Sequence, residues 1–197
     1  VMYLYILLFL LEVNFIENVG KIFEKNWNNS IDKNEIYRVR LKDSPLSFKT
    51  YSDIKFVSSN PYDSIYFYDK ESKFFGLEFK TTKYSYMTIQ RSKSDKNKMI
   101  KNHQIKGLTD FIRYENAFGF FILDFRGSGI TYGLSIDKFL DFLVNTTKKT
   151  ISESDVQKLG AIKIQKCLKR KHYVYDVIDF FNKAIKNKEI KATASGG

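Results

Sequence analysis

The sequence contains very little cysteine or histidine: one cysteine, Cys167, and two histidines, His103 and His172, among 197 residues. A single cysteine excludes an internal disulfide and favours a reducing compartment, so we expect a cytoplasmic protein. These three side chains are also too few for the usual structural zinc site, which takes four such ligands. The sequence therefore argues against both a disulfide scaffold and a zinc module.

A hydrophobic run long enough to cross a bilayer is also absent. The apolar run at 2–11 has about half of the ~20 residues that a membrane-spanning helix needs. No positive side chain precedes it and no small-residue cleavage site follows it, which disfavours a secretory signal. We expect no membrane association, and residues 1–17 form an apolar extension whose role the sequence leaves open.

Acidic residues are in the minority, with 22 against 33 lysines and arginines, which gives a net charge of +11 and an isoelectric point near 9.5. Such a surplus favours a polyanionic partner, with nucleic acid as the first candidate. The alternative is an AT-rich genome, whose codons enrich Lys, Asn, Ile, Phe and Tyr without any binding role. The charges are spread along the chain rather than gathered in one tail.

Length and hydrophobic periodicity predict one mixed α/β domain at 18–185. The expected helices are 20–29, 98–114, 137–144, a short helix capped by Ser152, and 175–185. The expected strands are 36–41, 62–68, 73–82, 117–125 and 130–136. Residues 43–59 suit an excursion or short stalk between strands, and 186–197 are predicted to be a disordered tail.

The hairpin at 62–82 places charged side chains in a specific arrangement. If Tyr68 pairs with Lys73 across the turn at 69–72, the same register sets Asp63 opposite Glu78. Residues two apart on a strand share a face, so Lys80 points with Glu78 while Leu77 and Phe79 point into the core. The hairpin therefore predicts two carboxylates and an ammonium group on one spot.

Opposed carboxylates repel, and a divalent cation would offset that repulsion. Mg²⁺ prefers one or two carboxylates, with water and substrate phosphate completing its octahedron. A lysine beside it could hold a water or a phosphate oxygen, which together suits metal-assisted phosphodiester hydrolysis. The alternative is a solvated strand edge on which charged and apolar residues happen to alternate.

Six segments, taken in order, resemble the RecU-like Holliday junction resolvases, and especially their phage-type relatives, in the PD-(D/E)XK nuclease superfamily. The segments are 18–24, 37–44, 60–63 (Asn-Pro-Tyr-Asp), 76–82 (Gly-Leu-Glu-Phe-Lys-Thr-Thr), 103–105 (His-Gln-Ile) and 117–126. Two departures stand out. Tyr62 separates Pro61 from Asp63, and the segment between Arg40 and Asn60 is shorter than the stalk of the bacterial RecU proteins.

The resemblance implies a restriction-endonuclease-like core, with a central mixed β-sheet flanked by helices, that uses Mg²⁺, with Mn²⁺ as the other candidate metal. It implies a homodimer that resolves four-way DNA, since a two-fold protein can place one active centre on each of two opposed strands. In the implied site, Asp63, Glu78 and the Phe79 carbonyl hold the metal, Glu24 helps through water, Lys80 orients the attacking water, and Gln104 supports the centre.

DNA contacts are expected along the first strand and the segment after it. The candidates are Arg38, Arg40, Lys42, Lys49, Lys55 and His103. A basic row beside a metal site would suit phosphate positioning, although the basic residues could equally be a solvated strand face and His103 a helix cap or core-edge residue. A second basic cluster, at 163–171, is more typical of a soluble surface.

Two other functions stay open on the sequence alone. One is a nuclease of the same superfamily that acts on duplex DNA, in restriction or repair. The other is a basic DNA-binding protein without catalysis, in which the acidic residues are structural. Metal-dependent nicking separates the enzymes from the binding protein, and preference for junctions over duplex separates the two enzymes.

Overall fold

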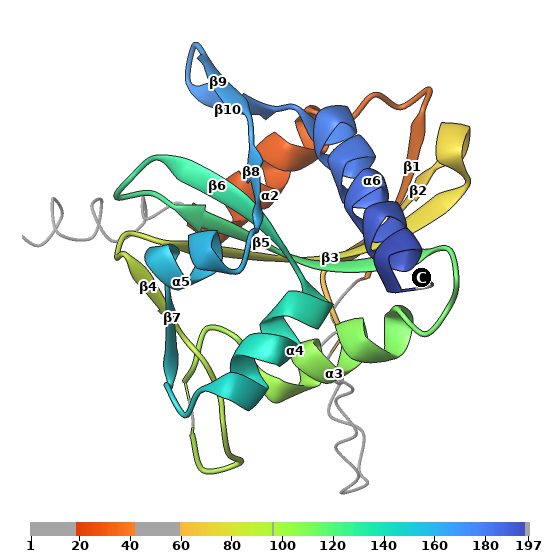
Figure 1. The fold of residues 1–197 in the computed structure, drawn as a ribbon. Helices are drawn as coiled ribbons and strands as arrows, with labels where there is room; N and C mark the ends of the chain where they lie inside the picture. Colours follow the sequence, from red (N-terminus) through yellow and green to blue (C-terminus); the bar gives the residue numbers. More distant parts are fainter. Residues whose placement is uncertain (1–18, 42–59, 96, 196–197) are drawn as a thin grey trace, which may run out of the picture.

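A computed structural model describes residues 19–41, 60–95 and 97–195, and it shows a mixed α/β fold (Figure 1). The central sheet has six strands in the order β1-β2-β3-β5-β6-β8. β3 and β5 are parallel and the other neighbours are antiparallel. Their bounds are β1 Ile36–Arg40, β2 Ser64–Tyr68, β3 Lys73–Thr82, β5 Ala117–Phe125, β6 Ile130–Ser135 and β8 Ile162–Ile164. The expected fold class, a mixed sheet flanked by helices, is confirmed.

Helices cover both faces of the sheet (Figure 1). They are α2 Val19–Asn29, α3 Asn102–Phe111, α4 Ile136–Asn145, α5 Glu153–Lys158 and α6 Val177–Ser195. One core cluster joins α2 and α6 to the face of β3 and β5 that carries Phe79 and Phe120. A second cluster joins α3 and α4 to the opposite face, which carries Phe121 and Leu123.

Two small antiparallel ribbons complete the fold. β4 Tyr86–Thr88 pairs with β7 Thr150–Ser152, and β9 Lys166–Lys169 pairs with β10 His172–Tyr175. Neither ribbon was expected, because each strand is short and lacks a long alternating pattern. The Ser152 cap was expected, and its side chain accepts a hydrogen bond from the backbone N–H of Asp155 at the start of α5.

The end of the chain departs from prediction. Residues 186–197 were expected to be disordered, but α6 continues to Ser195. Lys188 explains part of this, since its Nζ donates to the carbonyl oxygens of Ala117 and Glu115, at 3.2 and 3.3 Å, and lies 4.6 Å from the Phe118 ring centroid. Lys, Glu and Ala also have high helix propensity. The helix is therefore anchored to the edge of β5 beyond the predicted end.

Some expectations fall outside the described ranges. These are the apolar extension at 1–17 and the proposed stalk at 43–59. No helix in the described ranges is long and apolar enough to cross a membrane.

Candidate active site

The β2–β3 hairpin has the register that the sequence predicts. Tyr68 pairs with Lys73, and the pairing continues to Ser64 and Leu77. Asp63 lies one residue beyond the last pair, where its N–H donates to the carbonyl of Leu77 over 3.2 Å. Its carboxylate Oδ2 accepts a hydrogen bond of 2.8 Å from the backbone N–H of Phe79. Asp63 is thus held at the peptide that follows Glu78.

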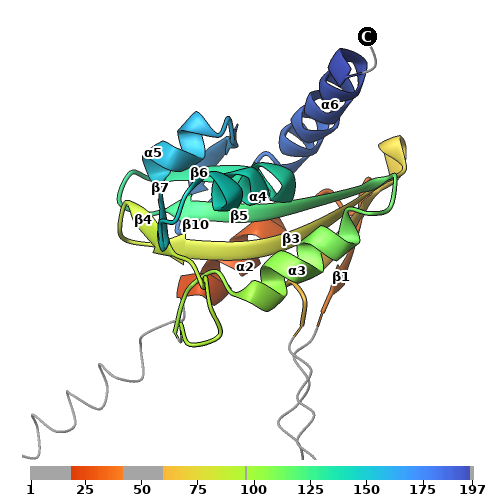
Figure 2. The ribbon, with the colours of Figure 1, turned by 60° about the horizontal axis from the view of Figure 1, so that its bottom comes forward.

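Glu78 lies on a central strand, and its residue is only 2% exposed. β3 lies between β2 and β5 in the sheet, and Figure 2 shows β3 and β5 side by side. Glu78 pairs with Phe121 on β5 and directly follows Leu77, the last residue of β3 that pairs with β2. Leu77 and Phe79 point into the core on the α2 and α6 face, as predicted. The alternative of a solvated strand edge does not describe this position, because a carboxylate here loses its hydration.

Two donors converge on one oxygen of Glu78. Lys80 Nζ lies 2.6 Å from Oε1, and Gln104 Nε2 donates to the same atom over 2.5 Å. The orientation of the Gln104 amide follows from its other end, because Gln104 Oε1 accepts the backbone N–H of Lys101 over 3.0 Å. No described residue donates to Oε2 of Glu78.

The charge on Glu78 is disfavoured by its surroundings. Burial raises the pKa of Glu78 to about 8, and the negative charges of Asp63 and Glu24 add to that rise. Lys80 acts in the opposite direction but does not outweigh burial. A cation bound at this carboxyl would reverse the balance, because it stabilises the ionised form.

Glu24 approaches from α2, which packs on the other face of the sheet. Its Oε2 lies 3.3 Å from a guanidinium nitrogen of Arg40. Burial raises the pKa of Glu24, Asp63 raises it further, and Arg40, Arg38 and Lys80 lower it. Of these charges, Asp63 and Lys80 belong to the β2–β3 site, whereas Arg38 and Arg40 lie on β1.

A glycine in α3 allows the helix to approach the loop that carries Asp63. A Cβ at Gly107 would lie 2.3 Å from Pro61 Cβ and 2.8 Å from the Pro61 backbone. Such a distance is far below van der Waals contact, so only glycine permits this approach. Because Gln104 lies three residues before Gly107, the same contact sets how closely Gln104 meets Glu78.

The predicted DNA contacts are only partly described. Arg38 donates to Ser64 Oγ from Nε at 3.3 Å and from Nη2 at 3.1 Å, with its guanidinium 5.9 Å from the Tyr66 ring centroid. Arg40 is paired with Glu24 and keeps a side chain that is 56% exposed, so both arginines have partners at the edge of the site and their role in DNA binding stays a prediction. Burial and the charges of Lys101 and Lys80 lower the pKa of His103, which places it near the cluster. Lys42, Lys49 and Lys55 lie outside the described residues.

The donor types at the site suit a hard cation. Asp63, Glu78 and Glu24 offer carboxylate oxygens, the ligands that Mg²⁺ and Mn²⁺ prefer. Within the described ranges, no three Asp, Glu, His or Cys side chains are close enough together to hold a metal ion. The carboxylates therefore suit the metal by donor type alone, and metal binding stays a prediction.

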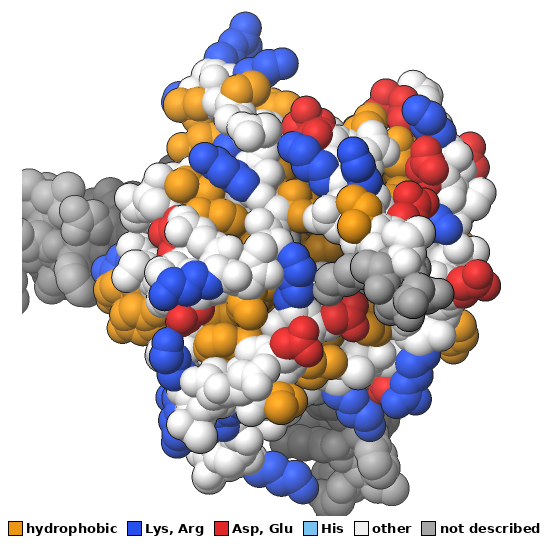
Figure 3. Space-filling model, in the orientation of Figure 1, with side chains coloured by type: hydrophobic (Ala, Val, Ile, Leu, Met, Phe, Trp, Pro, Cys, Tyr) orange, Lys and Arg blue, Asp and Glu red, His pale blue; other side chains and the backbone are white. Residues whose placement is uncertain are grey.

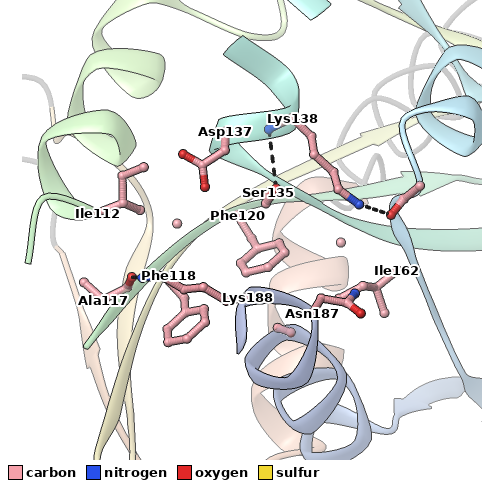
Figure 4. A pocket seen from close by; sticks show the side chains of 14 residues that line it. Ile112, Ala117, Phe118, Phe120, Ser135, Asp137, Lys138, Ile162, Asn187 and Lys188 are labelled. Carbon is pink, nitrogen blue, oxygen red and sulfur yellow. Dashed lines mark hydrogen bonds between the residues drawn. The ribbon is translucent and has the colours of Figure 1, made fainter. Parts of the chain in front are cut away.

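A cavity of about 180 Å³ lies elsewhere, between α6, the start of β5 and the start of α4 (Figure 4). Phe118, Phe120 and Ile162 give it apolar walls. Its lysines meet backbone carbonyls, Lys138 at Gly160 and Lys188 at Ala117. None of its lining residues belongs to the carboxylate cluster.

One buried ion pair was missed by the sequence analysis. Asp124 and Lys166 have side chains that are 8% and 9% exposed, and Lys166 Nζ lies 2.8 Å from Asp124 Oδ1. Thr131 donates to the same oxygen over 2.8 Å, and Thr81 donates to Oδ2 over 3.0 Å. The signal was a lone carboxylate in the otherwise apolar strand 117–125, but nothing in the sequence named its partner.

Fold and site together define a mixed α/β protein with a buried carboxylate, lysine and glutamine cluster at its central strands. No known family model matches the chain. It is 31% identical over 151 residues to the SPbeta prophage-derived uncharacterized protein YotM of Bacillus subtilis (strain 168), and the match covers 76% of this chain and 69% of that protein. The chain belongs to the same family as this prophage-derived protein.

Proposed function

We propose that the protein is a Mg²⁺-dependent endonuclease of the PD-(D/E)XK type that resolves four-way DNA junctions. The observation that carries the proposal is the convergence of Lys80 and Gln104 on the buried carboxyl of Glu78, with Asp63 hydrogen-bonded to the next peptide. Burying an acid costs free energy of folding, so its presence on a central strand favours a functional role. Its strand position and its lysine two residues later match the resemblance found in the sequence.

Each residue has a distinct role in the proposal. Asp63, Glu78 and the Phe79 carbonyl hold Mg²⁺, or Mn²⁺, and Glu24 contributes through water. The metal, when bound, supplies positive charge to the phosphate and lowers the pKa of a water. Lys80 holds the attacking water or a phosphate oxygen, as a compact point charge can. Gln104 fixes the carboxyl of Glu78 in one orientation.

A branched DNA substrate is supported by two kinds of observation outside the cluster. The net charge of +11 favours nucleic acid. The sequence resembles junction resolvases from 18 to 181, and the family includes a prophage-derived protein. A homodimer is proposed because a four-way junction has approximate two-fold symmetry, which a two-fold protein can match.

The test is one purified protein on three DNA substrates: an immobile four-way junction, a fork and a linear duplex, each with and without Mg²⁺. The Glu78→Gln variant removes the charge but keeps the shape, and Glu71→Gln removes an exposed carboxylate outside the site. We expect Mg²⁺-dependent nicking of the junction by the parent and by Glu71→Gln, and none by Glu78→Gln.

The other outcomes distinguish the alternatives. Equal cutting of junction and duplex would defeat the resolvase assignment and leave a nuclease of the same superfamily. DNA binding without metal-dependent cutting would leave a non-catalytic binding protein. Cutting by Glu78→Gln at the parental rate would remove the site assignment.

A further inference from the structure

The β9–β10 ribbon projects from the body at the upper left of Figure 1 and carries a dense positive charge. Residues 162–175 contain no Asp or Glu, and their basic residues are Lys163, Lys166, Lys169, Arg170 and Lys171. Only Lys166 forms an ion pair with a described residue. Figure 3 shows Lys and Arg side chains at the tip of this projection. We call residues 166–175 the basic hairpin.

The basic hairpin is fixed at its base. A two-stranded ribbon alone is marginally stable in water. Here Lys166 reaches inward to Asp124, donates to Thr131 Oγ1 over 2.9 Å, and lies 4.7 Å from the Tyr173 ring centroid. A buried ion pair contributes little net stability, and its best attested use is to fix one arrangement. This pair therefore holds the hairpin in one position on the sheet.

The same contacts tie the hairpin to the candidate active site. Asp124 also accepts from Thr81, the residue after Lys80 on β3. Tyr175 packs against Phe23, the residue before Glu24 on α2, with ring centroids 5.7 Å apart. Two of the elements that supply the site, β3 and α2, thus contact the hairpin and set its orientation relative to the site.

The turn of the hairpin has a charged residue in a strained backbone conformation. Lys169 pairs with His172, so Arg170 and Lys171 form a two-residue turn. Arg170 has φ of 57°, in the left-handed region where Gly, Asn and Asp are the usual residues. Strain of this kind clusters at functional sites. Glycine would adopt this positive φ at a lower free-energy cost than Arg170 does, which favours a role for the arginine side chain.

We propose that the basic hairpin enters the major groove of a duplex DNA arm and contacts its phosphates, an inference that rests on the proposed function. The major groove of B-form DNA admits a two-stranded ribbon, and basic side chains bind the phosphates on either side. An acidic protein partner is less suited, because protein interfaces need an apolar centre, and only Leu168 and Tyr173 are large exposed apolar residues on the hairpin.

The first test compares two variants of equal charge. Lys169→Gln, Arg170→Gln and Lys171→Gln together remove three charges from the hairpin. Lys70→Gln, Lys158→Gln and Lys186→Gln remove three exposed charges from other elements, so both variants fall from +11 to +8. Junction affinity is measured in Ca²⁺ at several salt concentrations, and the slope of log affinity against log salt is compared.

The magnitude of that slope should be smaller in the hairpin variant than in the parent by about two to three, since each phosphate contact contributes about 0.9. Its affinity should fall at least about tenfold at moderate salt, while the control keeps nearly the parental slope. Equal slopes for the two variants would overturn the proposal. So would an equal effect of the hairpin variant on an A-form RNA duplex, whose major groove is too narrow for side chains to read.

A single substitution separates binding from folding. Arg170→Gly relieves the positive φ, so its melting temperature should be no lower than that of the parent, while its DNA affinity falls a few-fold. A lower melting temperature with unchanged affinity would assign Arg170 to the fold and overturn the proposal.

Nicking in Mg²⁺, measured in parallel, separates this inference from the proposed function. If the parent protein cuts junctions but the hairpin variant and the control variant have equal slopes, the proposed hairpin contact is wrong and the nuclease proposal stands. If DNA binding depends on the hairpin but no cutting occurs, the proposed nuclease activity is wrong and the hairpin contact stands. No DNA affinity in the parent protein overturns both.

Discussion

Gln104 on α3 donates a hydrogen bond to Oε1 of Glu78 on β3, across 26 positions of sequence. The amide is fixed at both ends, because its own oxygen accepts the Lys101 N–H at the start of the helix. A glutamine in this place serves two functions: it caps α3 and it orients the buried carboxyl.

Gln104→Glu should therefore weaken the site while leaving the helix cap intact. The new carboxylate can still accept from Lys101, but it faces Glu78 with a like charge instead of a donor. Loss of one hydrogen bond to a charged group is worth about 1.5–3 kcal/mol, so cleavage should fall roughly 10- to 100-fold. We expect the pH at which activity appears to move upward, because the pKa of Glu78 rises further.

Thr109→Ala is a matched control for that variant, since Thr109 lies on the same helix and its hydroxyl donates to the carbonyl of Ile105 within that helix. The measurement is the cleavage rate against pH at fixed Mg²⁺. An unchanged pH profile for Gln104→Glu would show that Gln104 does not act through Glu78.

Lys80 lies 2.6 Å from the same oxygen, and its removal should slow the chemical step. Lys80→Ala should reduce the single-turnover rate at saturating Mg²⁺ by at least roughly 100-fold, in the range of a lost proton-transfer or electrostatic partner. Lys80→Arg should restore little of the rate, because the planar guanidinium group of arginine does not replace the compact ammonium charge of lysine. Lys73→Ala, on the same strand beyond the site, is the control, and a normal rate for Lys80→Ala would exclude the role.

The local part of this site could be predicted from sequence. Alternation at 73–82 and the turn residues at 69–72 specify the hairpin register, and the register carries Asp63 to Glu78. Both signals lie within a few residues of each other, so no tertiary information was needed. The limits of β5, at 117 and 125, were predicted for the same reason.

The distant partners could not be predicted from pattern. Glu24 on α2 pairs with Arg40 at the end of β1, and Asp124 on β5 pairs with Lys166 on β9, so both contacts join residues that are distant in the sequence. Gln104 was assigned through the resemblance, since a glutamine on a helix gives no sign of which strand it will meet. Helix α6 extends beyond its predicted end at 185, and tertiary contacts of Lys188 account for the first part of that extension.

Stability should fall with pH because of Glu78. Its pKa is raised from an ordinary value of 4.5 to about 8 in the folded protein, so the folded state holds a proton that the unfolded state has lost between these values. The contribution is fully present below pH 4.5 and is lost as the pH rises through 8, by an amount on the order of a few kcal/mol. Melting temperatures in EDTA should show this decline.

Glu78→Gln should flatten that decline, because the amide does not titrate, while Glu71→Gln should follow the parent. Mg²⁺ should stabilise the parent more at pH 8.5 than at pH 6, since it binds the ionised carboxyl. Identical pH dependence for the parent and Glu78→Gln would show that Glu78 is not the titrating group.

Gly107→Ala tests whether the close approach of α3 to the Pro61 loop builds the site. Alanine has the higher helix propensity, by about 1 kcal/mol, so an unconstrained helix would gain stability from the change. Here the new Cβ would lie 2.3 Å from Pro61 Cβ, and the helix and loop must move apart. Overpacking costs about 1–3 kcal/mol, so we expect a net loss of stability together with a loss of cleavage.

The control for Gly107→Ala is Lys106→Ala, at an exposed position of the same helix, which should keep both stability and activity. Thermal unfolding and Mg²⁺-dependent nicking are measured on both proteins. The movement separates Gln104 on the helix from Glu78 on the strand and shifts Asp63 with the loop, so activity should fall by more than stability alone explains. A Gly107→Ala protein that cuts at the parental rate would show that the Pro61 contact does not set the geometry of the site.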